Sequence, residues 1–569
     1  MTLSATIDPP PQKTSRLPLF RRDDRGWVIA VAILAVIVSA PLISIIILAF
    51  GPTDGLWPHL IEHVLPRSSW STVQLMAGVG ALTISIGVVS AWLVTMCTFP
   101  GRRMLEWMLL CPLAVPTYIV AYAYADVLDV TGPVQTVVRT MFGFTSARDY
   151  WFPEIRSLGG AIFVMGFVLY PYVYLTTRAM FLMQSACLLD VSRTLGAGPL
   201  RVFFKVAVPL ARPAIAIGAT LVLMETLNDI GAVEFLGVRT LTFSVYDTWL
   251  NRGSLTGATQ IAVVLLIIVI GLIWLERHAR RHQRFHLTTS RYRALPSYQL
   301  IGWRAGLAAI ACALPMLIGF VVPATVLIIQ ASRRLDEVFN AKFVGAISNS
   351  LLLAVAAAAV TVVAGILMAY AVRSRKSLFI SALTRVASVG YAIPGTVLAV
   401  GILIPLAAFD NFVDSTMRAT LGISTGLLIS ASGVALVYAY AVRFLTVSYG
   451  AIDTGLTKIS PSLDMASRAL GRGALSTLRE VHLPLLRPIL LSAAMLVFVD
   501  CMKELPATIL LRPFNFETLS TLVYEAASLE AFEDGAPAAL AIVLVGTLPV
   551  IMLARMSALS FRSENVERG

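Results

Sequence analysis

Long apolar runs, separated by short charged segments, make up most of the chain. A run of about 20 residues is long enough to cross a hydrocarbon layer ~30 Å thick as a helix. Twelve such runs lie near 27–50, 72–97, 105–128, 159–182, 213–236, 258–275, 303–330, 347–372, 378–408, 422–446, 489–511 and 536–557. Pro112, Pro116 and Pro394 break the third and ninth runs, so the pattern leaves their edges open. It predicts an all-α integral membrane protein with about 12 transmembrane helices.

The composition agrees with a membrane location. Hydrophobic residues make up 57% of the chain and charged residues 13%, against about 25% charged residues in soluble proteins. The five cysteines include no Cys-x-x-Cys pair, so neither a zinc ribbon nor a disulfide framework is predicted. The polar segment 1–26 precedes an apolar run that is too long for a secretory signal peptide.

The distribution of basic residues predicts the orientation. When the N-terminus is placed in the cytoplasm, most of the 44 Lys and Arg residues, Arg443 among them, fall on the cytoplasmic side. This asymmetry follows the positive-inside rule, predicts that both termini are cytoplasmic, and accounts for the net charge of +12 without nucleic acid. In the basic loop, His278, His282 and His286 recur every four residues. They allow a metal-binding helix face, but a basic linker at the anionic lipid leaflet is favoured.

Two cytoplasmic loops repeat one another. "DVSRTLGAGPLRVFFKVAVPLARP" (190–213) aligns without a gap with "MASRALGRGALSTLREVHLPLLRP" (465–488), at a constant offset of 275 positions. Each loop lies between the fourth and fifth runs of its half. We therefore expect two six-span halves fused head to tail. Because six is even, the halves face the same way, about a pseudo-twofold axis along the membrane normal.

This repeat predicts the domain organisation. The expected parts are a cytoplasmic N-terminal tail (1–26), a first half (27–276, with its permease core at about 71–276), a basic cytoplasmic linker (277–302), a second half (303–557, core at about 346–557) and a cytoplasmic tail (558–569).

The repeated loop resembles the signature of ABC-importer permeases. That signature has a small or acidic triplet, three residues, Gly, nine residues, and an aliphatic-x-aliphatic-Pro ending. The matching positions are Asp190, Gly196 and Pro209 in the first loop and Met465, Gly471 and Pro484 in the second. The resemblance implies the type I importer architecture. The usual Glu is Asp190 in one half and Met465 in the other, so we expect the two loops to bind their partner unequally.

The loops are expected to transmit force from a separate ATPase. Gly196 permits a sharp bend, and Pro209 and Pro213 are expected to stop helices before the fifth span. The apolar side chains of Leu200, Phe203 and Phe204 lie on the first loop, which should face water, and Leu475 is a candidate coupling residue of the second loop. They either pack on the protein's own underside or, as we favour, dock in a groove of the partner.

The chain lacks an ATP-binding signature. No G-x-x-x-x-G-K-[ST] phosphate loop occurs in it. We therefore expect a transport subunit that is not an enzyme and binds no cofactor. ATP and Mg are expected on the ABC ATPase partner, in two copies.

Three carboxylates, Glu225, Asp229 and Glu234, lie in one apolar run. A carboxylate near the bilayer centre costs about 2.5–3.5 kcal/mol, and such residues mark transport pathways by default. At the 275 offset Glu225 and Asp229 correspond to Asp500 and Glu504, and each pair shares a helix face. We expect these four acids, unpaired in the resting state, to converge on the axis as the substrate pathway, with Glu234 at its outer mouth.

Structural pairing of these acids is the alternative interpretation. Lys503 is adjacent to Glu504 in sequence and would neutralise it, while Arg512 or Arg239 would lie at the outer end. This pairing explains one acid but not the duplication.

Clustered oxygen anions favour a hard cation. The segments 224–242 and 502–519 resemble the fused permeases of the bacterial ferric-iron importer family. The resemblance implies Fe(III) as cargo, bound transiently by Glu225, Asp229, Asp500 and Glu504. It also implies an external or periplasmic iron-binding protein as partner, and the plasma (inner) membrane as location. Alternatives are import of thiamine, a polyamine or a phosphonate, or a proton-coupled secondary transporter, against which the repeated loops argue.

The tyrosine-rich segment 116–129 has two interpretations. Tyr118, Tyr122 and Tyr124 offer phenol oxygens that suit Fe(III), with Asp126 and Asp129 nearby. An aromatic belt at the membrane interface is favoured.

Overall fold

The computed structural model describes residues 25–52, 55–183, 194, 197–280, 298–334, 336, 340–374 and 377–566. Eleven helices in these residues are long and apolar enough to cross a membrane. A pair of helical segments, Arg102–Ala114 and Thr117–Phe142, is bent by 93°, and the number of spans is 12 when this pair is counted as one broken span. The prediction of an all-α membrane protein with about 12 spans is confirmed.

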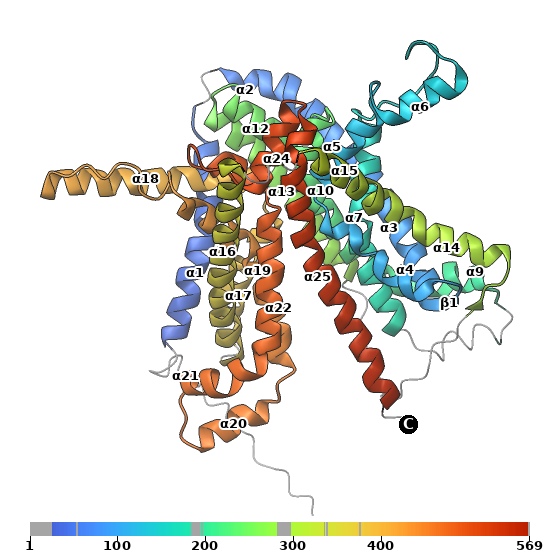
Figure 1. Ribbon diagram of the computed structural model, residues 1–569. Helices are drawn as coiled ribbons and strands as arrows, with labels where there is room; N and C mark the ends of the chain where they lie inside the picture. Colours follow the sequence, from blue (N-terminus) through green and yellow to red (C-terminus); the bar gives the residue numbers. More distant parts are fainter. Residues whose placement is uncertain are drawn as a thin grey trace, which may run out of the picture.

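The main helices of the described part of the first half follow one another in the order α1 to α13 (Figure 1). They are α1 (Arg25–Ala49), α3 (Leu65–Met96), α4 (Arg102–Met108), α5 (Thr117–Leu128), α6 (Pro133–Phe142), α7 (Leu158–Met183), α10 (Val208–Asn228), α11 (Gly231–Phe235), α12 (Leu241–Leu250) and α13 (Leu255–Arg280). Shorter elements are α2 (Leu56–His59), η2 (Leu60–Val64), β1 (Cys97–Thr98), η3 (Cys111–Ala114), α9 (Pro199–Val202) and η4 (Phe203–Ala207).

The second half follows the same order. Its helices are α14 (Trp303–Met316), α15 (Val322–Arg333), α16 (Ala341–Ser374), α17 (Leu378–Ala387), α18 (Gly395–Leu421), α19 (Gly433–Thr457), α20 (Pro461–Ala469), α21 (Ala474–Thr477), α22 (Leu483–Met502), α23 (Pro506–Leu511), α24 (Leu519–Ser528) and α25 (Phe532–Val566). Shorter elements are β2 (Tyr298–Gln299), η5 (Leu317–Val321), η7 (Gly390–Ala392) and η8 (Leu478–His482).

Matching hydrogen bonds recur in the two halves. The backbone N–H of Leu241 donates to Thr72 Oγ1 (3.0 Å) in the first half. In the second half, the N–H of Leu519 donates to Ser350 Oγ (2.9 Å). Both donor and acceptor are shifted by 278 positions, so the start of α12 is held on α3 as the start of α24 is held on α16.

The first helix of each half packs against the other half. α1 contacts α16, α17 and α18, while α14 contacts α3 and α4. Strand β2, which precedes α14, pairs in parallel with β1 at the end of α3. The two halves are therefore joined through both of their N-terminal helices.

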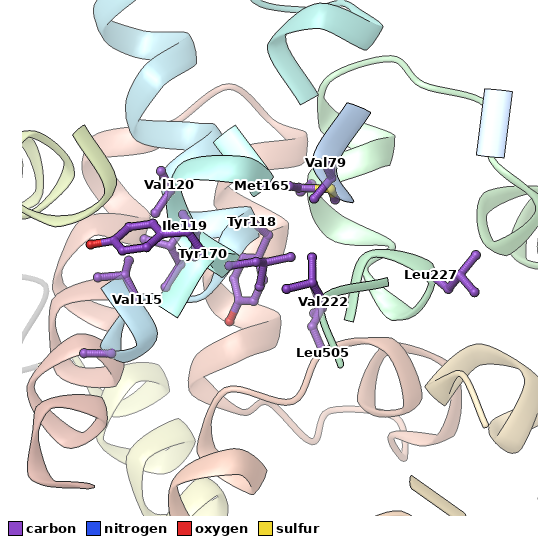
Figure 2. Packing of buried hydrophobic residues seen from close by; sticks show 14 of the residues in the cluster. Val79, Val115, Tyr118, Ile119, Val120, Met165, Tyr170, Val222, Leu227 and Leu505 are labelled. Carbon is purple, nitrogen blue, oxygen red and sulfur yellow. The ribbon is translucent and has the colours of Figure 1, made fainter. Parts of the chain in front are cut away.

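A continuous buried core lies between the halves. Figure 2 shows Tyr118 of α5, Met165 of α7 and Val222 of α10 in the same cluster as Leu505, which comes from the second half. Gly231 lies at this junction, where an added Cβ would be 2.8 Å from Leu505 Cδ2 and 2.9 Å from Tyr118. The close approach requires glycine and brings the chain breaks of the two halves together.

The prolines after the repeated loops do not stop helices, contrary to the expectation. Residues Pro199–Asn228 form one helical span, with Pro209 in the first turn of α10 and Pro213 inside it. Pro209 has no N–H to donate to the preceding turn of this continuous span, and that preceding turn is π-helical rather than α-helical. A π-helical turn, η4, lies directly before α10, and η8 occupies the same place before α22.

Candidate functional site

A cavity of about 90 Å³ lies between the two halves and is lined by residues of both. The four predicted pathway acids, Glu225, Asp229, Asp500 and Glu504, all line it. They converge there because both halves break a helix at the same place. α10 ends at Asn228 and α11 begins at Gly231, while α22 ends at Met502 and α23 begins at Pro506.

Each break is capped by the second acid of its half. Asp229 Oδ1 accepts a hydrogen bond from the N–H of Ala232 (2.9 Å), and the hydroxyl of Thr117 donates to the same carboxylate. Glu504 Oε1 accepts from the N–H of Ala507 (3.1 Å). These carboxylates satisfy N–H groups that the start of a helix leaves without an intrahelical partner.

The charge of the cavity is asymmetric between the halves. Arg443 Nη1 lies 2.5 Å from Glu504 Oε1, and Lys503 Nζ lies 2.9 Å from Asp500 Oδ1. At the 275 offset, Arg443 and Lys503 correspond to Val168 and Asn228, which also line the cavity.

The expectation that all four acids are unpaired is therefore wrong, and the alternative of structural pairing applies to the second half, with different partners. The four acids are not all unpaired, because both acids of the second half have basic partners. Lys503 pairs with Asp500 rather than with Glu504, and Arg512 pairs with Glu517. Within the described residues, no Lys or Arg forms an ion pair with Glu225 or Asp229, so the excess negative charge belongs to the first half.

Glu225 accepts a hydrogen bond from the other half instead of forming an ion pair. The hydroxyl of Tyr391 in η7 donates to Glu225 Oε1 (2.8 Å). The neighbouring Asn228 Oδ1 accepts from the N–H of Gly395 (2.7 Å). The acid-bearing end of α10 is thus tied to the start of α18 in the other half.

The four acids do not form a metal site in this conformation. In the part of the chain that the structure describes, no three His, Cys, Asp or Glu side chains are placed to hold a metal ion. Four carboxylates and two basic side chains line the cavity, and Arg443 and Lys503 form their ion pairs with the acids of the second half.

Arg443 was missed as a site residue because it was counted with the cytoplasmic basic residues. The structure places it inside α19 with 6% of its surface exposed. The available signal was a lone arginine within the apolar segment "AYAVRFLTV" (439–447), which an intramembrane partner explains. Tyr391 gave no such signal, because tyrosine is ordinary beside a membrane helix.

The coupling residues of the second loop lie at one end of the molecule, near α20 and α21 (Figure 1). Gly471 joins these two helices with a φ of 76°, as expected of a bend. Met465 and Leu475 are 64% and 69% exposed, and Pro484 lies in the first turn of α22.

In the first loop, Asp190 and Gly196 lie outside the described residues, as do His282 and His286 of the linker. Leu200 is 75% exposed, which suits docking. Phe203 is buried, with its ring 5.2 Å from that of Trp92. The docking role expected for Phe203 is therefore wrong, and the exposed aromatic residue is its neighbour Phe204.

The tyrosine-rich segment is not an interface belt. Tyr118 and Tyr122 are buried, and Tyr118 lines the cavity. Tyr124 is buried as well, and its hydroxyl donates to the carbonyl of Ile318 (2.7 Å). Glu234 lies beyond the cavity and accepts a hydrogen bond from Tyr524 (2.8 Å).

Comparison with known proteins gives consistent matches. Residues 83–284 match the family described as binding-protein-dependent transport system inner membrane component. The Fe(3+)-transport system permease protein FbpB 2 of Haemophilus influenzae is 24% identical over 85% of this chain and 88% of its own length. The molybdenum transport system permease protein ModB of Escherichia coli K12 is 28% identical over 38% of this chain and 97% of its own.

A further relative also matches about a third of the chain. The putative 2-aminoethylphosphonate transport system permease protein PhnU of Salmonella typhimurium is 28% identical over 37% of this chain and 73% of its own. The helical spans, the paired chain breaks and these matches agree. Residues 83–284 are therefore similar to the family of binding-protein-dependent transport system inner membrane components, and most of the chain is similar to a permease of that kind.

Proposed function

We propose that this chain is the transmembrane permease of an ATP-driven importer that carries ferric iron across the bacterial plasma membrane. The observation that carries the proposal is the cavity in which two broken helices bring four carboxylates together, with Glu225 and Asp229 lacking a basic partner among the described residues. Oxygen anions in excess suit a hard cation. A relative named for Fe(3+) transport aligns with 85% of the chain, which includes both halves.

The proposed mechanism is alternating access. An external iron-binding protein delivers Fe(III) at the end of the molecule that holds α12 and α24, and the cation passes the cavity. Glu225 and Asp229 contact it first because they carry no basic partner. Asp500 and Glu504 remain paired with Lys503 and Arg443, which hold the second half rigid around the passage.

Energy reaches the chain from a partner. Two copies of a separate ABC ATPase bind ATP and Mg and dock on the exposed apolar residues Leu200, Phe204, Leu475 and Met465. These residues belong to the cytoplasmic side, together with both termini and the basic linker 277–302. The two halves, 27–276 and 303–557, then move as the transport units.

Other cargoes remain alternatives that one experiment separates. Relatives of part of the chain are named for molybdenum and for 2-aminoethylphosphonate transport, and the acids also suit thiamine or a polyamine. The permease is purified with its ATPase, and ATP hydrolysis is measured with the binding protein loaded with each cargo. We expect stimulation by the iron-loaded protein alone. Stimulation by another cargo, with none by iron, would replace ferric iron in the proposal.

Substitution of Gly471 tests the coupling role. Gly471→Val is expected to uncouple ATP hydrolysis from uptake while membrane insertion stays intact, because a β-branched residue is strained at a φ of 76°. Uptake and hydrolysis are recorded in the same proteoliposomes. Gly473→Val is the matched control, since Gly473 has an extended backbone (φ −75°) and open space around its Cβ position.

The first loop is expected to be more sensitive than the second. Gly196→Val should impair uptake more than Gly471→Val, because the first loop carries the acidic Asp190 where the second carries Met465. Equal losses in the two variants would count against unequal coupling, and normal uptake in both would remove the coupling role.

A further inference from the structure

Two tyrosines from opposite halves meet at the end of the molecule remote from α20 and α21 (Figure 1). The hydroxyl oxygens of Tyr246 and Tyr524 are 3.2 Å apart. Tyr246 is the sixth residue of α12 and Tyr524 the sixth residue of α24, and both helices follow a capping threonine. They are counterparts at the 278 offset that also relates the hydrogen bonds at the starts of α12 and α24. Contact between counterparts places the pair on the pseudo-twofold axis.

This pair lies beyond the acid cavity. The hydroxyl of Tyr524 also donates to Glu234 Oε2 (2.8 Å), and Glu234 lies on α11, directly after the break that holds Asp229. α12 and α24 lie at the opposite end of the molecule from α20 and α21 (Figure 1). Tyr246, Tyr524 and Glu234 therefore join the halves on the outer side of the acids.

The other side of the cavity is wider. A second cavity of about 530 Å³ lies between the halves, lined by Leu221 and Met224 of α10 and by residues of α17 and α19. These α10 positions precede Glu225, so they are nearer to the coupling loop along the helix. Tyr391 lines both cavities. The acids thus lie between a contact of the two halves on the side of α12 and α24 and a larger cavity on the side of the coupling loops.

We infer that Tyr246 and Tyr524, with Glu234, form the outer gate of the transport pathway, closed in this inward-facing conformation. The inference rests on the proposed role as an ATP-driven importer. Because the two hydroxyls meet where the halves meet, cargo reaches the acids only when this contact separates. The gate opens when α12 and α24 move apart, and both hydrogen bonds of Tyr524 are lost.

The test measures access to the cavity from outside. Val168→Cys, in a chain whose five native cysteines are replaced, places a thiol in the cavity wall. A membrane-impermeant thiol reagent is added outside sealed vesicles that contain the complete complex without ATP. We expect Tyr524→Phe to raise the labelling rate at least about five-fold, because two hydrogen bonds that favour the closed state are lost. Tyr246→Phe removes one bond and should give a smaller increase.

Two controls are needed. One distinguishes opening of the gate from a general weakening of the contacts between the halves, and the other tests the proposed function separately. Glu530→Gln breaks another contact between the halves, the ion pair with Arg156 (2.9 Å), and should leave labelling unchanged. Labelling of the denatured protein sets the maximum. Unchanged labelling in both tyrosine variants, or an equal increase in Glu530→Gln, would overturn the gate. Labelling needs no cargo, so ATP-dependent iron uptake by the unsubstituted complex decides the proposed function separately.

Discussion

Arg443→Met is expected to lower the free energy of unfolding by about 3–5 kcal/mol, the cost of leaving one member of a buried ion pair without its partner. Arg443 and Glu504 are 6% and 3% exposed. Glu504 also caps α23, so its carboxylate cannot leave the cavity without releasing the N–H groups of Ala507 and Thr508. The variant should melt at a lower temperature in detergent and yield less assembled complex.

Two further variants test this explanation. Adding Glu504→Gln to Arg443→Met should recover part of the stability, because no unpaired charge remains and the amide oxygen still accepts from Ala507, while the N–H of Thr508 loses its acceptor. Arg418→Met removes an ion pair with Asp414 in which the arginine is 61% exposed, and it should cost only about 0.2–1 kcal/mol. An unchanged melting temperature in Arg443→Met would show that the pair does not hold the second half around the cavity.

The paired substitution Glu225→Gln with Asp229→Asn is expected to leave the fold intact and to reduce ferric uptake by about 100-fold or more. Each charge-assisted contact to a desolvated cation contributes about 1.5–3 kcal/mol, and a loss of 1.36 kcal/mol is tenfold in rate. The amides keep an oxygen for the hydrogen bonds from Tyr391 and Ala232. Uptake of radioactive ferric iron and ATP hydrolysis are measured together.

The matched control removes charge from the second half. Asp500→Asn with Lys503→Met deletes an acid and a base together, so the net charge of the cavity is unchanged. This variant should lose less than tenfold in uptake, because a net-neutral change leaves the attraction for a cation nearly the same. Equal losses in the two double variants would show that the halves contribute alike, and wild-type uptake in the first would make Glu225 and Asp229 structural.

The four acids could be predicted to meet because one offset relates both the loops and the acids. Acids at equivalent positions of the two halves, such as Glu225 and Asp500, are most simply explained by a shared pathway. The pairing of these acids could not be predicted, because Arg443 lies near the end of an apolar run. A sequence pattern does not separate an arginine at the end of a helix from one a few turns inside it.

The tyrosine pair was hidden by a change in offset. The loops and acids are related by 275 positions, but α12 and α24 are related by 278, since the segment between Glu504 and α24 is three residues longer than its counterpart. At an offset of 275, Tyr246 aligns with Thr521 and the pair is not seen. Hydrogen bonds such as those of Thr72 and Ser350 were needed to establish the second offset.

The sequence also could not predict which side chains of α9 and η4 are exposed. Leu200, Phe203 and Phe204 are all apolar, and which of them faces the partner depends on helix phase. The π-helical turn η4 begins at Phe203 and changes that phase, so that Phe203 is buried against Trp92 while Phe204 is exposed. A π-helical turn has no clear signature in sequence.

ATP-dependent accumulation of radioactive ferric iron tests the account most directly. Proteoliposomes contain the permease with its ATPase, the iron-loaded binding protein faces the outer side, and ATP is supplied to the ATPase side. The account predicts that iron accumulates with ATP, that it fails to accumulate with a non-hydrolysable analogue, and that Glu225→Gln with Asp229→Asn lowers the uptake about 100-fold or more. The account would be contradicted if the unsubstituted complex hydrolysed ATP and imported another cargo but did not accumulate iron.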